Sequence, residues 1–206
     1  MKSLHHSFII VVFAFLLAFS LSLAALARSS RIQSDLQRNI VRLHIIANSD
    51  CELDQNIKLL IRDRVVRNVK VGDSPELAAV EAAHIANSVL DEYAMPYTAR
   101  AEYTLCDFPE KSYKNITLPA GRYNAVRVVL GDGLGQNWWC VLYPPVCLLD
   151  KNTAVIDSNS QRILEECLDE ESYDFITRRS DGDIVVRFRS LELLGKFKEL
   201  LKGKLA

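Results

Sequence analysis

The sequence predicts a single α+β domain, in which a mostly antiparallel sheet has helices packed on one side. Segments of period-two alternation lie on either side of two stretches whose apolar residues recur at three- and four-residue steps, and no strand–helix–strand repeat runs along the chain. With 206 residues, of which 49% are hydrophobic and 25% charged, the chain can bury one core. Its formal charge of -1 argues against a basic surface, so no nucleic-acid partner is expected.

The N-terminal segment is apolar and carries no charge over residues 8–26, and Lys2 precedes it. Small residues end this run, which is typical of a secretory signal peptide over residues 1–27, cut after Ala27. The run also approaches the roughly 20 residues that span a bilayer, so an uncleaved anchor is the alternative. Either way we expect the rest of the chain outside the cytoplasm, meeting the membrane only through this segment. The mixed-charge residues 28–39 are expected to form a polar stalk.

The predicted domain covers residues 40–206 and opens with a strand, because apolar side chains alternate over residues 41–47. An amphipathic helix follows over residues 53–69. After a Gly-Asp break, a serine cap, a first-turn proline and an early acid predict a second helix over residues 75–93.

Three further strands are expected at residues 97–105, at 123–130 and in the apolar run 138–149. The glycines of residues 131–135 predict a tight hairpin turn between the last two. The C-terminal part adds a short helix, a strand and a last helix, near residues 163–168, 184–188 and 190–201. The predicted order of elements is therefore β-α-α-β-β-β-α-β-α.

The tripeptide Asn48-Ser49-Asp50 joins the first predicted strand to the first helix. Ser49 with Glu52 makes a capping box, and Asp54 is an alternative cap. The same short polar side chains at a helix start also suit contact with a partner. Capping is the simpler interpretation, and partner contact is the functional one.

Two adjacent tryptophans, Trp138 and Trp139, point to opposite faces if their segment is a strand. We expect one in the core and the other available as an anchor for a protein partner. The candidate contact residues are Asn48, Ser49, Asp50, Trp138 and Trp139.

Five cysteines include Cys140 and Cys147, which face each other if Tyr143-Pro144 is the tip of a hairpin. Opposed residues approach to about 4.5–5.5 Å between Cα atoms, which a disulfide tolerates. The alternative is that Cys140 is a nucleophile with His44 as its base, as in an extracytoplasmic cysteine-dependent cell-wall amidase or transpeptidase. No C-x-x-C spacing or other ligand pattern occurs, so neither a metal nor a cofactor is predicted.

Three runs of residues together resemble a known family. They are Val41–Asp50, with Asp54, Gln55 and Lys58 just after it, then Pro119–Val128, and Gly131–Cys147, which contains Asn-Trp-Trp-Cys followed by Pro-Pro-Val-Cys. Over residues 40–150 the chain resembles stage II sporulation protein R of endospore-forming bacteria. Residues 151–206 form a less typical C-terminal extension. Cys51 stands where the family pattern suggests a serine.

The resemblance implies a function that the composition does not. Proteins of this family are exported from the forespore into the intermembrane space. There they are thought to activate a membrane-embedded aspartic peptidase, through its outward-facing part, so that it processes pro-sigma-E. The family is not credited with hydrolysis, so the resemblance implies a secreted signalling protein without catalytic residues.

Overall fold

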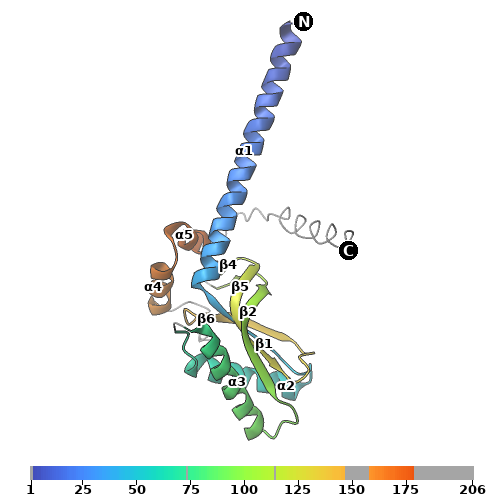
Figure 1. The fold of residues 1–206 in the computed structure, drawn as a ribbon, viewed down its shortest axis with the longest axis vertical. Coiled ribbons are helices and arrows are strands. Elements are labelled where there is room, and N and C mark those ends of the chain that lie inside the picture. The colour runs from blue at the N-terminus through green and yellow to red at the C-terminus, as the bar shows by residue number, and fades with distance from the viewer. Residues whose placement is uncertain (1, 73, 114, 147–157, 179–206) are drawn as a thin grey trace.

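The computed structural model describes residues 2–72, 74–113, 115–146 and 158–178, and these form an α+β domain with a long N-terminal helix (Figure 1). The strand predicted near residues 184–188 and the helix predicted near 190–201 lie outside the described residues. The helices are α1 (Lys2–Asn39), α2 (Glu52–Asn68), α3 (Pro75–Glu92), α4 (Ser158–Cys167) and α5 (Glu170–Arg178). The strands are β1 (Val41–Ile46), β2 (Ala99–Phe108), β3 (Lys111–Ser112), β4 (Thr117–Leu118), β5 (Gly121–Leu130) and β6 (Asn137–Tyr143).

The main sheet has the strand order β2-β5-β1-β6. Strand β1 pairs with β5 in parallel, whereas the β1–β6 and β2–β5 pairs are antiparallel, so the predicted class and the mostly antiparallel sheet are confirmed. The short strands β3 and β4 form a second, two-stranded sheet in a segment where the sequence predicted no strand. Helix α5 was also not predicted.

Strand β1 lies between β5 and β6, so the hairpin turn predicted at residues 131–135 is wrong. This segment is instead a connection that crosses the end of β1. Every residue of β1 is buried, which is the burial of a central strand. Local alternation can place a strand in the sequence, but it cannot show which other strands it pairs with.

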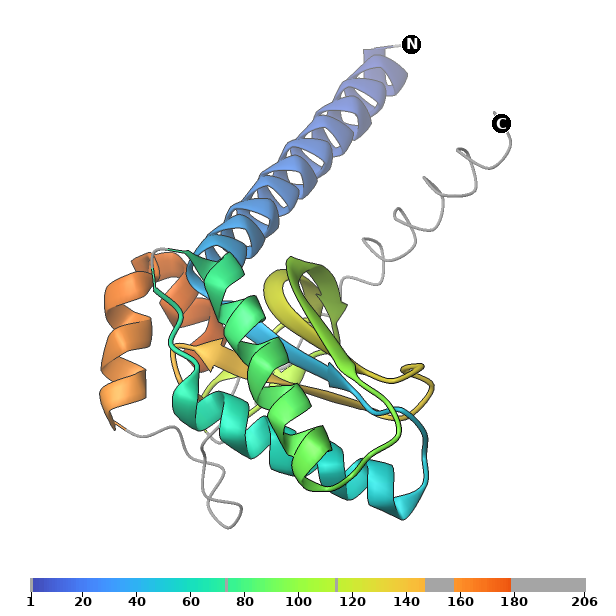
Figure 2. The same cartoon turned by 60° about the horizontal axis from the view of Figure 1, so that its bottom comes forward.

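Helices cover both faces of the sheet, and the prediction that they pack on one side holds only for α2 and α3. These two helices lie side by side (Figure 2) and share one apolar cluster with Leu43, Val128 and Leu142 of the sheet. A second cluster joins Ala125 and Val141 of the sheet to the C-terminal part of α1, β4, α4 and α5. Because β1, β5 and β6 bury residues on both faces, each face needs its own cover.

Residues 28–39, predicted to be a polar stalk, are the last turns of α1 and lie against the domain. Ile32 and Leu36 are buried in the second cluster. Two side-chain bonds join α1 to β5, because Gln33 Nε2 donates to the carbonyl of Arg122 and Asn124 Nδ2 donates to that of Gln37. This segment is therefore part of the core of the domain.

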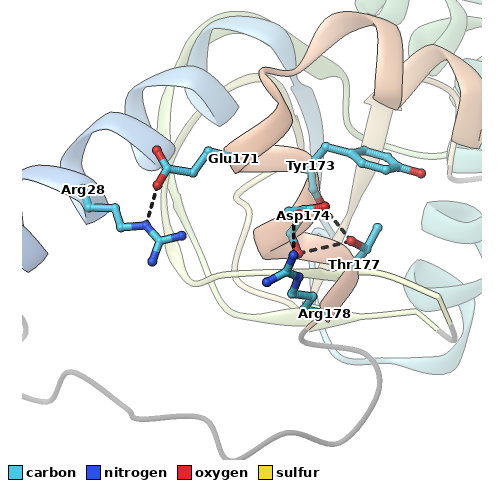
Figure 3. A network of polar contacts seen from close by, with 6 residues as sticks. All are labelled: Arg28, Glu171, Tyr173, Asp174, Thr177 and Arg178. Carbon is cyan, nitrogen blue, oxygen red and sulfur yellow. Dashed lines mark hydrogen bonds and ion pairs between the residues drawn. The ribbon is translucent and has the colours of Figure 1, made fainter.

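Helix α5 lies beside the same part of α1 (Figure 3). Arg28 pairs with Glu171 at 2.5 Å, but both side chains are largely exposed, and exposed ion pairs contribute little to stability. Asp35 is buried, and its Oδ2 accepts from the backbone N–H of Asp169 just before α5. We infer that apolar burial and the Asp35 bond, rather than the ion pair, hold α5 to α1.

The part of α1 that precedes the domain is exposed and apolar. By length and composition, the segment Ile9–Asn39 is a candidate membrane span, and a signal sequence passes the same test. Both predicted forms of the leader therefore stay open.

The core role of α1 predicts that Leu36→Ala lowers the free energy of unfolding by about 2–5 kcal/mol, because it removes a completely buried leucine. Arg38→Ala, on the exposed side of the same helix, should change stability by less than about 0.5 kcal/mol. Urea unfolding of both variants measures this. Equal stability of Leu36→Ala and the parent would mean that α1 is only a spacer.

Candidate functional site

The predicted contact tripeptide Asn48-Ser49-Asp50 follows β1, at the end of the sheet away from α1 (Figure 1). The connection from β5 to β6 passes over this end and is bonded to it by its backbone. Leu134 N donates to the carbonyl of Asn48 at 3.0 Å, and Gly135 N donates to that of Ala47 at 2.9 Å. The two segments, far apart in sequence, therefore form one unit.

Glycines are required in this connection for steric reasons. Gly131 and Gly133 have φ values of +52° and +66°, which side-chain-bearing residues rarely adopt. Gly135 has an ordinary φ, but a Cβ there would overlap the backbone carbonyl of Ser49. The glycines of residues 131–135 thus allow the connection to lie close against the backbone at the end of β1.

Asn48 is an internal link rather than an exposed contact. Its Nδ2 donates to Asp54 Oδ2 at 2.9 Å, and its Oδ1 accepts from Asp132 N at 3.0 Å. Asp50 is exposed, although its Oδ1 accepts from Gln136 N at 2.8 Å. Of the tripeptide, only Asp50 is therefore exposed, whereas Asn48 and Ser49 are half-buried and bonded within the unit.

Asp54 lies at the centre of this unit and is only 4% exposed. Its carboxylate accepts from Ser49 Oγ at 2.6 Å, from Asn48 Nδ2 and, at 2.5 Å, from Tyr97 OH. Burial by itself raises the pKa of Asp54, but the hydrogen bonds from Ser49, Tyr97, Asn48 and Cys51 outweigh it, so the pKa is lowered. Burial and then the bond to Asp54 raise the pKa of Tyr97. The Asp54 carboxyl therefore stays ionised and the Tyr97 hydroxyl stays protonated, as a bond from the hydroxyl to the carboxylate requires.

Lys58 fixes the other side of the connection and is also 4% exposed. Its Nζ donates to Gln55 Oε1 at 2.5 Å and to the carbonyl of Gln136 at 3.1 Å. Gln55 Nε2 in turn donates to the carbonyl of Ser49 at 2.8 Å. Burial lowers the pKa of Lys58, while Asp50 raises it. The sequence placed Lys58 in the family pattern and Tyr97 in a strand but predicted no role for either, because both act through contacts made only in the folded chain.

The predicted caps of α2 are wrong. The N-cap is Cys51, whose Sγ accepts from Asp54 N at 3.5 Å. Ser49 lies two residues earlier, and its Oγ accepts from Cys51 N and donates to Asp54. Because thiols are weak acceptors, the serine that the resemblance suggests at position 51 would be the stronger cap.

Trp138 and Trp139 lie on opposite faces of β6, as predicted, but both are half-buried. The guanidinium of Arg62 lies 4.2 Å from the ring centroid of Trp138. Trp139 stacks on His44 with 5.7 Å between ring centroids. The expected difference, with one tryptophan in the core and the other exposed, is therefore not seen, because both side chains are half-buried.

The structure does not assemble the Cys140–His44 nucleophile that was the alternative. Cys140 pairs with Leu43 and is buried with the α2–α3 cluster, whereas the neighbouring His44 points to the other face. Cys140 is disulfide-bonded, so its sulfur is not a thiolate in this structure. In the described part of the chain no group of three or more His, Cys, Asp or Glu side chains is placed to hold a metal ion.

The predicted partner of Cys140, Cys147, lies outside the described residues, so the pairing stays a prediction. One observation agrees with the hairpin that would bring the two together. Val146 N donates to the carbonyl of Val141 at 3.4 Å, and these two described residues have the register of the predicted hairpin.

The buried Asp54 network predicts a loss of stability in acid. A carboxyl whose pKa is lower in the folded than in the unfolded state stabilises the fold above its unfolded pKa of about 3.9. That contribution disappears as the pH falls through the folded pKa. Asp54→Asn should lower stability at pH 7 by about 1–3 kcal/mol, because amide donors then face other donors. It should also flatten the acid limb of a stability–pH profile, and an acid limb equal to that of the parent would contradict this role of Asp54.

Comparisons with known proteins agree on one family. The model of the family described as stage II sporulation protein R (spore_II_R) matches residues 37–153. Stage II sporulation protein R of Bacillus subtilis (strain 168) is 34% identical over 160 residues, which cover 69% of this chain and 70% of the relative. No solved structure matches the chain. The matched residues include the strand, the connection and the tryptophan segment described above, and the chain belongs to the stage II sporulation protein R family.

Proposed function

We propose that this chain is a sporulation signal exported from the forespore to the intermembrane space, where it activates a membrane-embedded aspartic peptidase that processes pro-sigma-E. The observation that carries this proposal is the family membership, which rests on residues 37–153. The apolar first part of α1 supports export, whether it is cleaved or stays as an anchor.

Activation by binding requires that the signal binds the active peptidase more tightly than the inactive one. Shifting an equilibrium from 1:99 to 99:1 takes a difference of about 10⁴-fold in affinity. A rigid contact surface helps, because no binding energy is then spent on ordering loops. The unit around Asp54 has this property, and the proposed contacts are Ser49, Asp50, Trp138 and Trp139, with Asn48 acting through the connection that it holds.

Reconstitution in a non-sporulating bacterial host tests the proposal. The chain is co-expressed with the candidate peptidase and pro-sigma-E, and the size of the precursor is followed on a gel. We expect processing that requires this chain and its leader, and that persists in an exported and folded Cys140→Ser variant. The peptidase with pro-sigma-E alone is the control. An intact precursor, although the chain is exported and folded, would contradict the proposal.

Leu134 adds a contact that the sequence did not suggest. Its side chain is 79% exposed, on a connection held by backbone bonds to Ala47 and Asn48. An apolar side chain presented on a rigid support suits a pocket on a partner.

Leu134→Ser should therefore reduce processing in the same assay by about ten-fold or more, while its free energy of unfolding changes by less than about 0.5 kcal/mol. Leu77→Ser is the matched control, because Leu77 is similarly exposed but lies on α3. Equal processing by the two variants would remove Leu134 from the contact surface.

A further inference from the structure

Strand β2 is one edge of the main sheet, and no strand of the described chain lies beside its outer side. Its residues pair with β5 in one unbroken register, without a bulge or a proline. No residue of β2 before Phe108 is buried, unlike the residues of the central strand β1. Native proteins usually block a long, regular edge, because its free backbone groups pair readily with another extended chain. The open β2 edge therefore calls for an explanation.

Hydrogen bonds show which residues of β2 present their backbone to the outer side. Ala99 N donates to Asn87 Oδ1 at 2.8 Å, and Asn87 Nδ2 donates to the carbonyl of Ala99 at 2.9 Å. The side-chain amide of Asn87, on α3, thus takes the place of a peptide group in an added strand. Since the backbone groups of a strand alternate between its two sides, Ala101, Tyr103 and Leu105 also point outward. Their outward N–H and C=O groups bond to no other described residue.

Helix α3 packs along this edge (Figure 2). Four of its residues recur at three- and four-residue steps and so share one side of the helix: Glu76, Val80, Ala83 and Asn87. Asn87 bonds to β2, and Glu76 is close enough to Tyr103 to be a cause, after burial, of the raised pKa of Tyr103. This side of α3 therefore flanks the β2 edge. A partner can reach it, because Val80 is 66% exposed and Glu76 is also exposed.

The charge beside the edge indicates what kind of strand it accepts. Helix α3 carries no Lys or Arg, and its acidic residues are Glu76, Glu81, Asp91 and Glu92. A second copy of the chain, paired antiparallel through β2, would place two acidic α3 helices on the same face of the joined sheet, where they repel each other. A strand with a basic side chain is instead attracted to Glu76. An apolar side chain two positions along that strand points to the same face, toward Val80.

We propose that the outer edge of β2 binds an extended segment of a protein partner as an added strand, with Ala101, Tyr103 and Leu105 bonding to its backbone. The segment carries a Lys or Arg beside Glu76 and an apolar residue against Val80. In such additions main-chain bonds supply affinity, and alternate side chains supply specificity. That the partner is the outward-facing part of the peptidase rests on the proposed function, whereas the strand site itself does not.

The site is first tested without the peptidase, by NMR on the full chain in detergent micelles. The probe is an acetylated and amidated peptide, Thr-Val-Thr-Lys-Thr-Val-Thr. Without the probe, the N–H groups of Ala101, Tyr103 and Leu105 should exchange quickly with solvent, and those of Glu102 and Thr104, which face β5, should exchange slowly. The probe should move the signals of the first three residues and slow their exchange, and it should leave the other two unchanged.

A probe with Glu in place of Lys should bind about three-fold more weakly or worse, and Glu76→Lys should reverse this preference. Glu81→Lys is the matched control, because Glu81 is also exposed but lies about 140° around α3 from Glu76. Slow exchange at Ala101, Tyr103 and Leu105 before the probe is added would overturn the proposal. If it persists on dilution, the chain itself covers the edge, and if dilution removes it, a second copy does. Equal movement of inward and outward N–H signals, or of neither, would also overturn the site.

The second test uses the processing assay. Ala101→Pro removes one outward N–H and leaves the bonds to β5, because proline is tolerated where the N–H of an edge strand faces outward. Ala101→Pro and Glu76→Lys should each reduce processing by about three-fold to ten-fold, and Glu81→Lys should process like the parent. Because Glu76 is exposed, Glu76→Lys decides the matter if Ala101→Pro fails to fold. Parent-like processing by exported and folded Glu76→Lys would overturn the peptidase as the partner at this edge.

The two tests separate the inference from the function on which it rests. If the parent chain fails to support processing while the probe peptide binds at β2, the proposed function is wrong and the strand site stands. If the parent chain supports processing while the probe moves no outward N–H signal of β2, the strand site is wrong and the function stands.

Discussion

Strand β1 needs partners on both of its edges and cover on both of its faces, and the remaining architecture follows from this requirement. Its backbone groups pair with β5 on one side and with β6 on the other, and none of its six residues is exposed. Since β5 and β6 are consecutive in sequence but separated by β1, the chain between them must cross the end of β1. The glycines of residues 131–135, the link through Asn48 and the buried Asp54 all serve this crossing.

The second face of β1 explains why the N-terminal helix is part of the fold. Arg42 and His44 point to this face, yet both are buried. Arg42 Nε donates to the carbonyl of Cys140 at 2.9 Å, and its guanidinium lies 4.3 Å from the ring centroid of Phe108 and 5.0 Å from that of Tyr123. Aromatic rings stabilise a cation that has little access to water. The end of α1, β4, α4 and α5 complete this layer with apolar side chains.

This arrangement gives α1 two roles along one helix. Its first part has the length and apolar composition of a leader or anchor, and its last turns belong to the core. A cut after Ala27 leaves Ile32 and Leu36 in place, so the packed domain does not depend on whether the leader is removed. The segment around Asp50 follows the end of β1 that lies away from α1 (Figure 1).

The sequence alone determined the features that depend on neighbours along the chain. Period-two alternation located β1, β2 and β5, helical spacing located α2 and α3, and the order of motifs identified the family. The opposite orientation of Trp138 and Trp139 follows from strand geometry alone. These predictions succeed because secondary structure and side-chain direction repeat with the period of the backbone.

Only the tertiary structure decided the pairing of the strands and the use of polar residues. Arg42 and His44 alternate with apolar residues, a pattern that predicts one solvated face, but aromatic side chains from β2, β5 and β6 cover them. Asn48 and Asp54 look like caps or contacts, and they are internal because residues more than 40 positions away bond to them. Such contacts cannot be read from local spacing, since they depend on which distant segments the folded chain brings together.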